Sequence, residues 1–92
     1  MANTILFACD FFGTNPGNFI PSLIAMEKHL YDSDFRVIYA FPQECIMFRW
    51  YQQMIYDGRT LYAYKKSSLK DNIRFLTELY KKEKFLLIHT HF

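Results

Sequence analysis

The chain has 92 residues, a formal net charge of +2, and a composition that is 51% hydrophobic and 20% aromatic. A chain of this length forms one domain at most, and so high an apolar content argues against disorder. The small net charge does not indicate nucleic-acid binding, and two cysteines are too few for a disulfide framework. Because no apolar run reaches the roughly 18 residues of a membrane span, and no signal peptide is evident, we expect a cytoplasmic domain.

The predicted elements alternate between strands and helices. An apolar run at residues 4–9 predicts a strand that is buried on both faces. The loop "DFFGTNPG" follows, and Asn18 is placed to cap a helix that extends to about Tyr31. Residues 35–41 predict a second strand, which Pro42 ends.

The second half of the chain continues this alternation. A helix is predicted over residues 44–57 and ends at Gly58. Residues 59–64 then predict a third strand. The inner face of the predicted helix is expected to carry Met47, Tyr51, Met54 and Ile55.

A third helix and a fourth strand complete the pattern. Ser68 and Asp71 have the spacing of a capping box at the start of a helix. The apolar run at residues 85–89 predicts the last strand. Helical spacing places four apolar side chains of the third helix on one inner stripe, namely Leu69, Ile73, Leu76 and Tyr80.

The order β-α-β-α-β-α-β predicts an α/β domain with three layers, in which right-handed crossovers join parallel strands. The usual strand order of such a Rossmann-like half domain is 3-2-1-4. The first and fourth strands are then neighbours, and ligands bind in the crevice at their carboxyl ends. The loop after residues 4–9 and the end of the last strand should therefore flank one crevice.

The loop "GTNPGN" leads into a helix N-terminus on one side of this crevice. Free backbone N–H groups and the helix dipole attract phosphate at such a place, and glycine lets a ligand approach closely. The loop has neither the G-x-G-x-x-G spacing nor the lysine of a P-loop. An ordinary β-to-α turn is therefore the alternative.

His89 and His91 belong to the other side of the crevice. Their H-x-H spacing on a strand directs both side chains the same way, as in many metal sites. Further ligands would have to come from Asp10 or from His29, which is expected at the far end of its helix. We expect instead that His89 packs against the sheet and that His91 faces the crevice.

The stretch "MFRWYQQM" adds aromatic side chains and a cation. Phe48 and Trp50 cannot both face the core from one helix, so one should be exposed, able to stack on a sugar or to meet a membrane surface. Partial burial at a helix edge is the alternative. Several lysines predict either a solvated face or attraction to anionic lipid, namely those at 65, 66, 70, 81, 82 and 84.

Two segments resemble a known family. "ILFACDFFGTNPGNFIPSLIAMEKHL" is similar to the opening of bacterial glycosyltransferases with the GT-B fold, particularly the retaining family four. "LYKKEKFLLIHTHF" resembles their next landmark, in which K-E-K precedes an apolar strand and an H-x-H pair. The resemblance implies that an N-terminal domain holds the acceptor and that a C-terminal domain, with an E-x7-E motif, holds the nucleotide sugar. It implies neither a bound metal nor another cofactor.

The resemblance also implies roles for individual residues. His91 would lie near the reacting sugar as the catalytic histidine, and Gly17 and Asn18, with Gly13, would approach the donor diphosphate. The acceptor side is expected to include Asp10, Phe12, Arg49 and Trp50.

Residues 1–92 match part of such an N-terminal domain and lack the donor domain. We therefore expect a piece of a transferase of polysaccharide biosynthesis that is inactive alone and associates with itself. A nucleotide sugar and a glycan or lipid-linked acceptor would bind the full enzyme, with peripheral contact to the inner face of the membrane. A non-catalytic flavodoxin-like binding domain and an H-x-H metal-dependent hydrolase are the alternatives.

Overall fold

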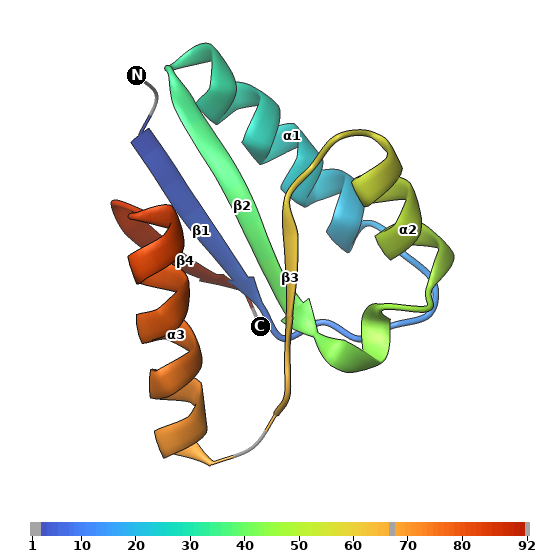
Figure 1. The fold of residues 1–92 in the computed structure, drawn as a ribbon. Coiled ribbons are helices and arrows are strands. Elements are labelled where there is room, and N and C mark those ends of the chain that lie inside the picture. The colour runs from blue at the N-terminus through green and yellow to red at the C-terminus, as the bar shows by residue number, and fades with distance from the viewer. Residues whose placement is uncertain (1–2, 67, 92) are drawn as a thin grey trace.

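Parallel strands and helices alternate along the chain (Figure 1). This computed structural model describes residues 3–66 and 68–91, and of His91 it describes only the backbone. The elements are β1 (Asn3–Cys9), α1 (Phe19–Asp32), β2 (Phe35–Pro42), the short 3-10 helix η1 (Gln43–Cys45), α2 (Arg49–Tyr56), β3 (Leu61–Tyr64), α3 (Leu69–Glu83) and β4 (Leu87–His91). The predicted order is therefore confirmed, with η1 as an addition.

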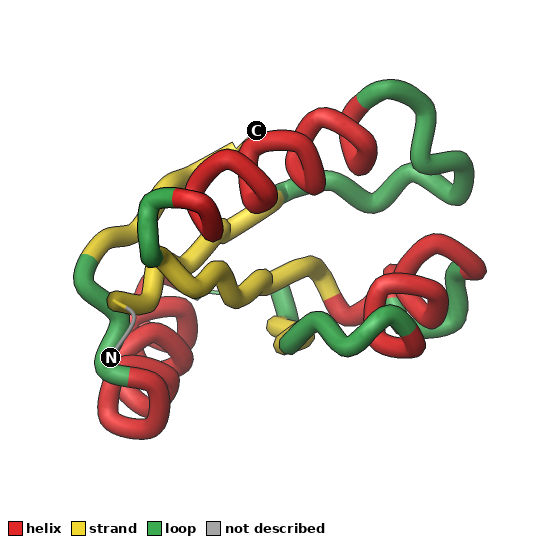
Figure 2. Tube along the Cα trace, turned by 90° about the horizontal axis from the view of Figure 1, so that it is seen from above, coloured by secondary structure: helices red, strands yellow, loops and turns green. Residues whose placement is uncertain are grey.

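The four strands form one parallel sheet in the order β3-β2-β1-β4, as predicted. Figure 2 shows the three layers, with α3 on one side of the sheet and α1 and α2 on the other. Because both faces of the sheet are covered near β1 and β2, these strands are continuous apolar runs and not alternating ones.

Two apolar cores fill the spaces between the layers. On the side of α1 and α2, the buried rings of Phe7, Tyr39, Phe41 and Trp50 contact one another edge-on or stacked. The smaller core under α3 contains Leu6, Ile38, Ala40, Leu79 and Phe85. Odd-numbered residues of β1 therefore face α1 and α2, and even-numbered ones face α3.

The predicted helix over residues 44–57 is wrong in its first half. The chain forms η1, becomes extended at Phe48 (φ −75°, ψ 145°), and begins α2 only at Arg49. Because Phe48 lies outside the helix, it and Trp50 both pack into the larger core, and the expected conflict between them does not arise. Met47 and Ile55 are consequently exposed, at 85% and 45%, and not on the inner face.

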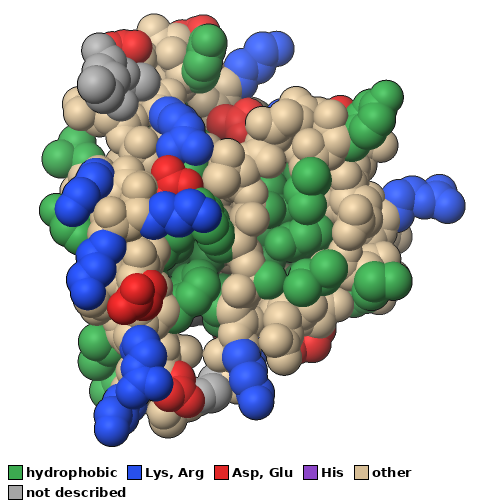
Figure 3. All heavy atoms as spheres, viewed as in Figure 1, with side chains coloured by type: hydrophobic (Ala, Val, Ile, Leu, Met, Phe, Trp, Pro, Cys, Tyr) green, Lys and Arg blue, Asp and Glu red, His purple; other side chains and the backbone are tan. Residues whose placement is uncertain are grey.

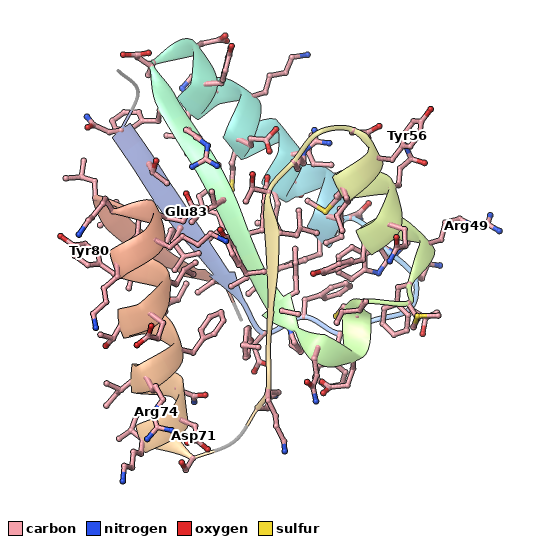
Figure 4. All side chains as sticks on the ribbon, in the orientation of Figure 1. Arg49, Tyr56, Asp71, Arg74, Tyr80 and Glu83 are labelled. Carbon is pink, nitrogen blue, oxygen red and sulfur yellow. The ribbon has the colours of Figure 1, made fainter. Side chains whose placement is uncertain are left out.

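The predicted inner stripe of α3 is also displaced. Leu79 is buried and Leu76 packs partly against the same core beside Phe75, so Leu76 was placed correctly, whereas Leu69, Ile73 and Tyr80 are exposed. Glu83 lies on the buried side as well, where it accepts hydrogen bonds from Arg36 and Tyr62. Figure 4 shows Glu83 directed at the sheet and Tyr80 directed away from it.

The expected capping box of α3 is confirmed. The backbone N–H of Asp71 donates to Ser68 Oγ at 3.3 Å, which caps the helix start. Lys81 and Lys82 lie in the last turn and are exposed, which fits a solvated face and a face attracted to anionic lipid equally (Figure 3). Among the described residues, no helix is both long enough and apolar enough to cross a membrane.

Candidate functional site

The carboxyl ends of β1 and β4 lie side by side, because Cys9 is the register partner of His91. The β1–α1 loop therefore begins beside the end of β4. This confirms the predicted juxtaposition of the glycine loop and the H-x-H segment.

The β1–α1 loop is fixed by contacts with η1 and α2. The indole Nε1 of Trp50 donates to the carbonyl of Gly13 at 2.8 Å, and Cys45 Sγ lies 3.2 Å from the carbonyl of Phe11. A Cβ at Gly13 would lie 2.9 Å from the ring of Phe11, so a larger residue would displace that ring. Packing against Phe11 thus favours glycine at position 13 independently of any ligand that the loop binds.

The segment at Gly17 and Asn18 has the backbone that the predicted phosphate loop needs. Gly17 adopts φ +54°, a conformation that favours glycine, and nothing lies within 4 Å of the place where its Cβ would be. The side chain of Asn15 accepts the Gly17 N–H at 3.1 Å and holds the turn. A ligand can therefore approach the backbone here without displacing a side chain.

The prediction that the Asn18 side chain caps α1 is wrong. Its side chain makes no capping hydrogen bond, and its carbonyl instead accepts the N–H of Ser22 at 3.1 Å and the Ser22 hydroxyl at 2.7 Å. The N–H of Asn18 has no acceptor among the described residues. It is therefore a free donor at the helix start, where the dipole favours an anion.

Lys66 joins the site from the β3–α3 loop, although the sequence predicted either a solvated face or attraction to anionic lipid for it. Its ammonium lies 2.7 Å from the half-buried carboxylate of Asp10 and 5.1 Å from the centre of the Phe12 ring. The pair offsets the negative charge of Asp10, which would otherwise repel a phosphate bound nearby. From the sequence, the nearness of Lys66 to Asp10 could have been inferred only from the rule that the carboxyl ends of parallel strands lie at one edge of a sheet.

Arg49 and Trp50 lie beside the part of the glycine loop from Thr14 to Pro16. They line an open hollow of about 520 Å³ together with Thr14, Asn15, Pro16 and Gln53. Trp50 is only 6% exposed, so it forms part of the wall and is not a free stacking platform. The four residues expected on the acceptor side thus separate into two groups, Arg49 with Trp50 and Asp10 with Phe12.

His89 lies on the α1 side of β4. Its ring meets Phe7 edge-on at 5.4 Å, yet the side chain remains exposed, so the expected packing against the sheet is only partial. It lines an open hollow of about 410 Å³ with His29, although sequence reasoning had separated these two histidines. The side chain of His91 is outside the described residues, so its position in the crevice stays a prediction.

The described residues contain no group of three or more His, Cys, Asp or Glu side chains that could hold a metal ion. The two cysteines are buried, and burial raises the pKa of the Cys9 thiol to about 12 and that of Cys45 to about 11. Burial, followed by the charge of Asp10, also raises the pKa of Tyr64 to about 12. Thiols and phenols of this kind stay protonated near neutral pH and are poor nucleophiles.

The edge of the sheet therefore offers an open glycine backbone, a free N–H at the start of α1, a neutralised carboxylate and a hollow that one arginine lines. Comparison of the chain with protein-family models, curated proteins and solved structures finds no match in any of the three. Inferences about chemistry consequently depend on the residues of this chain.

Proposed function

We propose that residues 1–92 form the acceptor-side part of a GT-B glycosyltransferase, which transfers a sugar from a nucleotide sugar to a glycan or lipid-linked acceptor. The observation that carries the proposal is the pairing of Cys9 with His91. It brings together, at one edge of the sheet, the two segments whose sequences resemble that family.

In this proposal the segment at Gly17 and Asn18 stabilises the leaving diphosphate. Negative charge develops on that group in the transition state, and the free N–H of Asn18 is already in place to meet it without reorganisation, whereas the Gly17 N–H is held by the side chain of Asn15. The open space at Gly17 admits the phosphate, and Lys66 limits repulsion from Asp10. A donor-binding domain would supply the rest of the nucleotide pocket, so this chain alone should not transfer sugar.

The proposal gives His91 a role beside the reacting sugar. An imidazole there can exchange hydrogen bonds with a sugar hydroxyl and so orient the ring for attack by the acceptor. The acceptor would approach over Thr14 and Arg49, which line the larger hollow. Acceptor and donor would then meet at the edge where β1 and β4 end.

The test begins with the DNA that follows codon 92 and with the neighbouring genes. We expect a donor-binding domain with an E-x7-E motif, and we expect the two parts together, but neither alone, to release nucleoside diphosphate from a nucleotide sugar. If no such domain is encoded, and the chain instead binds a protein partner tightly without any transfer, the proposal is wrong. A non-catalytic binding domain would then be favoured.

A further inference from the structure

Four side chains of α2 form a polar outer face, here defined as Arg49, Gln52, Gln53 and Tyr56. Their spacing of three or four residues places them on one side of the helix. The opposite side is buried through Trp50, Tyr51 and Met54. Figure 4 shows Arg49 and Tyr56 projecting from α2 away from the sheet.

Two hollows meet on this face. One is the hollow of about 520 Å³ that Thr14 and Asn15 line, and the other, of about 420 Å³, lies along Gln52, Ile55 and Tyr56. Arg49 and Gln53 line both of them. The two hollows, together called the groove here, are therefore adjacent along α2, and the first of them reaches the glycine loop at Thr14 and Asn15.

The groove carries an uncompensated positive charge. Arg49 has no ion-pair partner among the described residues, whereas Arg36 pairs with Glu83 at 2.9 Å and Arg59 pairs with Glu27 at 3.0 Å. No Asp or Glu lines either hollow. The guanidinium is therefore available to a carboxylate or phosphate of a ligand.

The two glutamines are oriented to accept hydrogen bonds. Gln52 Nε2 donates to the carbonyl of Ile46 at 2.6 Å, and Gln53 Nε2 donates to Asp57 Oδ1 at 2.9 Å. Each bond fixes the amide and leaves its Oε1 without a partner in the described chain. These oxygens are suited to the hydroxyl donors of a sugar.

Tyr56 adds an aromatic surface at the outer end of the groove. Its side chain is 86% exposed, although a tyrosine ring usually loses much of its apolar area to contacts in a folded protein. An exposed ring with a polar edge can stack on the apolar face of a pyranose. The face thus combines a cation, two amide acceptors and an aromatic ring.

We infer that the α2 outer face binds an acidic oligosaccharide. A carboxylate of the oligosaccharide binds Arg49, its hydroxyl groups donate hydrogen bonds to Gln52 and Gln53, and one of its sugar rings stacks on Tyr56. A membrane surface fits less well, because electrostatic attraction to anionic lipid needs several cations and this face has one. The inference rests on the proposed function and narrows its acceptor to an acidic glycan.

The test titrates the isotope-labelled chain with tetragalacturonic acid and, in parallel, with neutral maltotetraose, and follows backbone amide signals by NMR. We expect tetragalacturonic acid to change the amide chemical shifts of Thr14, Asn15 and residues 49–56, and maltotetraose to change them much less. Arg49→Gln should weaken binding about tenfold or more, because it removes a charge-assisted contact. Arg74→Gln is the matched control, since Arg74 is exposed on α3 and also lacks an ion pair among the described residues.

Equal affinity for the two tetrasaccharides, or an Arg49→Gln chain that binds as well as wild type, would overturn the inference. Shifts on α2 with phosphatidylglycerol vesicles and none with tetragalacturonic acid would overturn it as well and would indicate a membrane surface. Retained amide dispersion in each variant shows that it is folded. Because this binding needs neither donor nor transfer, its result is independent of the nucleoside diphosphate assay that tests the proposed function.

Discussion

The indole Nε1 of Trp50 donates a hydrogen bond of 2.8 Å to the carbonyl oxygen of Gly13. This bond joins α2 to the β1–α1 loop, although the two segments are far apart in sequence. It also explains why the indole lies inside the larger core with only its edge in the hollow. The bond consequently links Trp50, expected on the acceptor side, to the loop that contains the predicted phosphate segment.

Trp50→Phe tests this link. The phenylalanine keeps most of the apolar contact but leaves the Gly13 carbonyl without its donor, so we expect a loss of about 1–2 kcal/mol in the free energy of unfolding. Urea denaturation measures it. Tyr51→Phe is the control, because Tyr51 is buried and its hydroxyl has no hydrogen-bond partner among the described residues. If both variants lose the same stability, the Trp50–Gly13 bond does not hold the loop.

The strand order could be predicted because it follows from the alternation of apolar runs and helical repeats, which are local features. The juxtaposition of the glycine loop with His91 followed from that order alone. By contrast, the break before α2 and the rotation of α3 depend on distant contacts. Glu83 bonds Arg36 and Tyr62 on the buried side of α3, and no spacing within the helix records those partners.

The candidate site shows the same division. The loop and the strand end could be placed from sequence, whereas the pairing of Lys66 with Asp10 could not. Lys66 follows β3, which is separated from β1 by β2, so only the three-dimensional sheet edge brings its long side chain to the carboxylate.

A second prediction concerns pH and Glu83. Burial alone would raise the pKa of Glu83, but the hydrogen bonds from Tyr62 and Arg36 outweigh it and lower the pKa below its usual value. A carboxyl with a lowered folded pKa stabilises the fold above its unfolded pKa of about 4.3, and the stabilisation is lost as the pH falls through the folded pKa.

We therefore expect Glu83→Gln to cost about 1–2 kcal/mol at pH 7 and progressively less as the pH falls below about 4.3, the unfolded pKa, and through the lowered folded pKa. Thermal unfolding at a series of pH values measures this. Glu78→Gln is the control, because Glu78 is 69% exposed and lies 3.9 Å from Lys81. A difference between Glu83→Gln and wild type that does not change with pH would contradict the assignment.

A third prediction concerns the thiols. Because the pKa values of Cys9 and Cys45 are raised to about 12 and 11, thiolate should be roughly a thousandth of the total or less at pH 8. We expect the folded chain to react with a thiol reagent far more slowly than the same chain in urea, where both cysteines react. Rapid modification of either cysteine in the folded chain would show that the core around it opens readily.

A fourth prediction separates the two strand histidines in the assembled transferase. His91→Ala should lower sugar transfer while folding stays intact, because the proposal places His91 beside the reacting sugar. His89→Ala should mainly lower stability, by about 0.5–1 kcal/mol, since it loses the edge contact with Phe7. Initial rates and thermal unfolding of both variants distinguish these effects. Equal losses of stability with no change in transfer would show that the assignment is wrong.

The last prediction concerns self-association through the outer edge of β4. This strand is at the end of the sheet, so part of its backbone has no neighbouring strand within the described chain. Leu86 and Leu87 are 65% and 57% exposed, and Ile73 and Tyr80 expose further apolar area on α3. Apolar edge strands readily pair with another chain, and a domain of this size has little stability to offset such a surface.

We expect the 92-residue chain to form dimers or larger oligomers at micromolar concentration, which light scattering and sedimentation measure. Leu87→Lys should shift the equilibrium toward monomer, because a charge on an edge strand opposes pairing with a second copy. Met47→Lys is the matched control, since Met47 is 85% exposed and lies before α2, away from β4. A wild-type chain that is monodisperse, monomeric and cooperatively folded at these concentrations would show that the exposed β4 edge does not cause self-association. Equal effects of the two lysine substitutions would instead show that charge in general, and not the β4 edge, controls association.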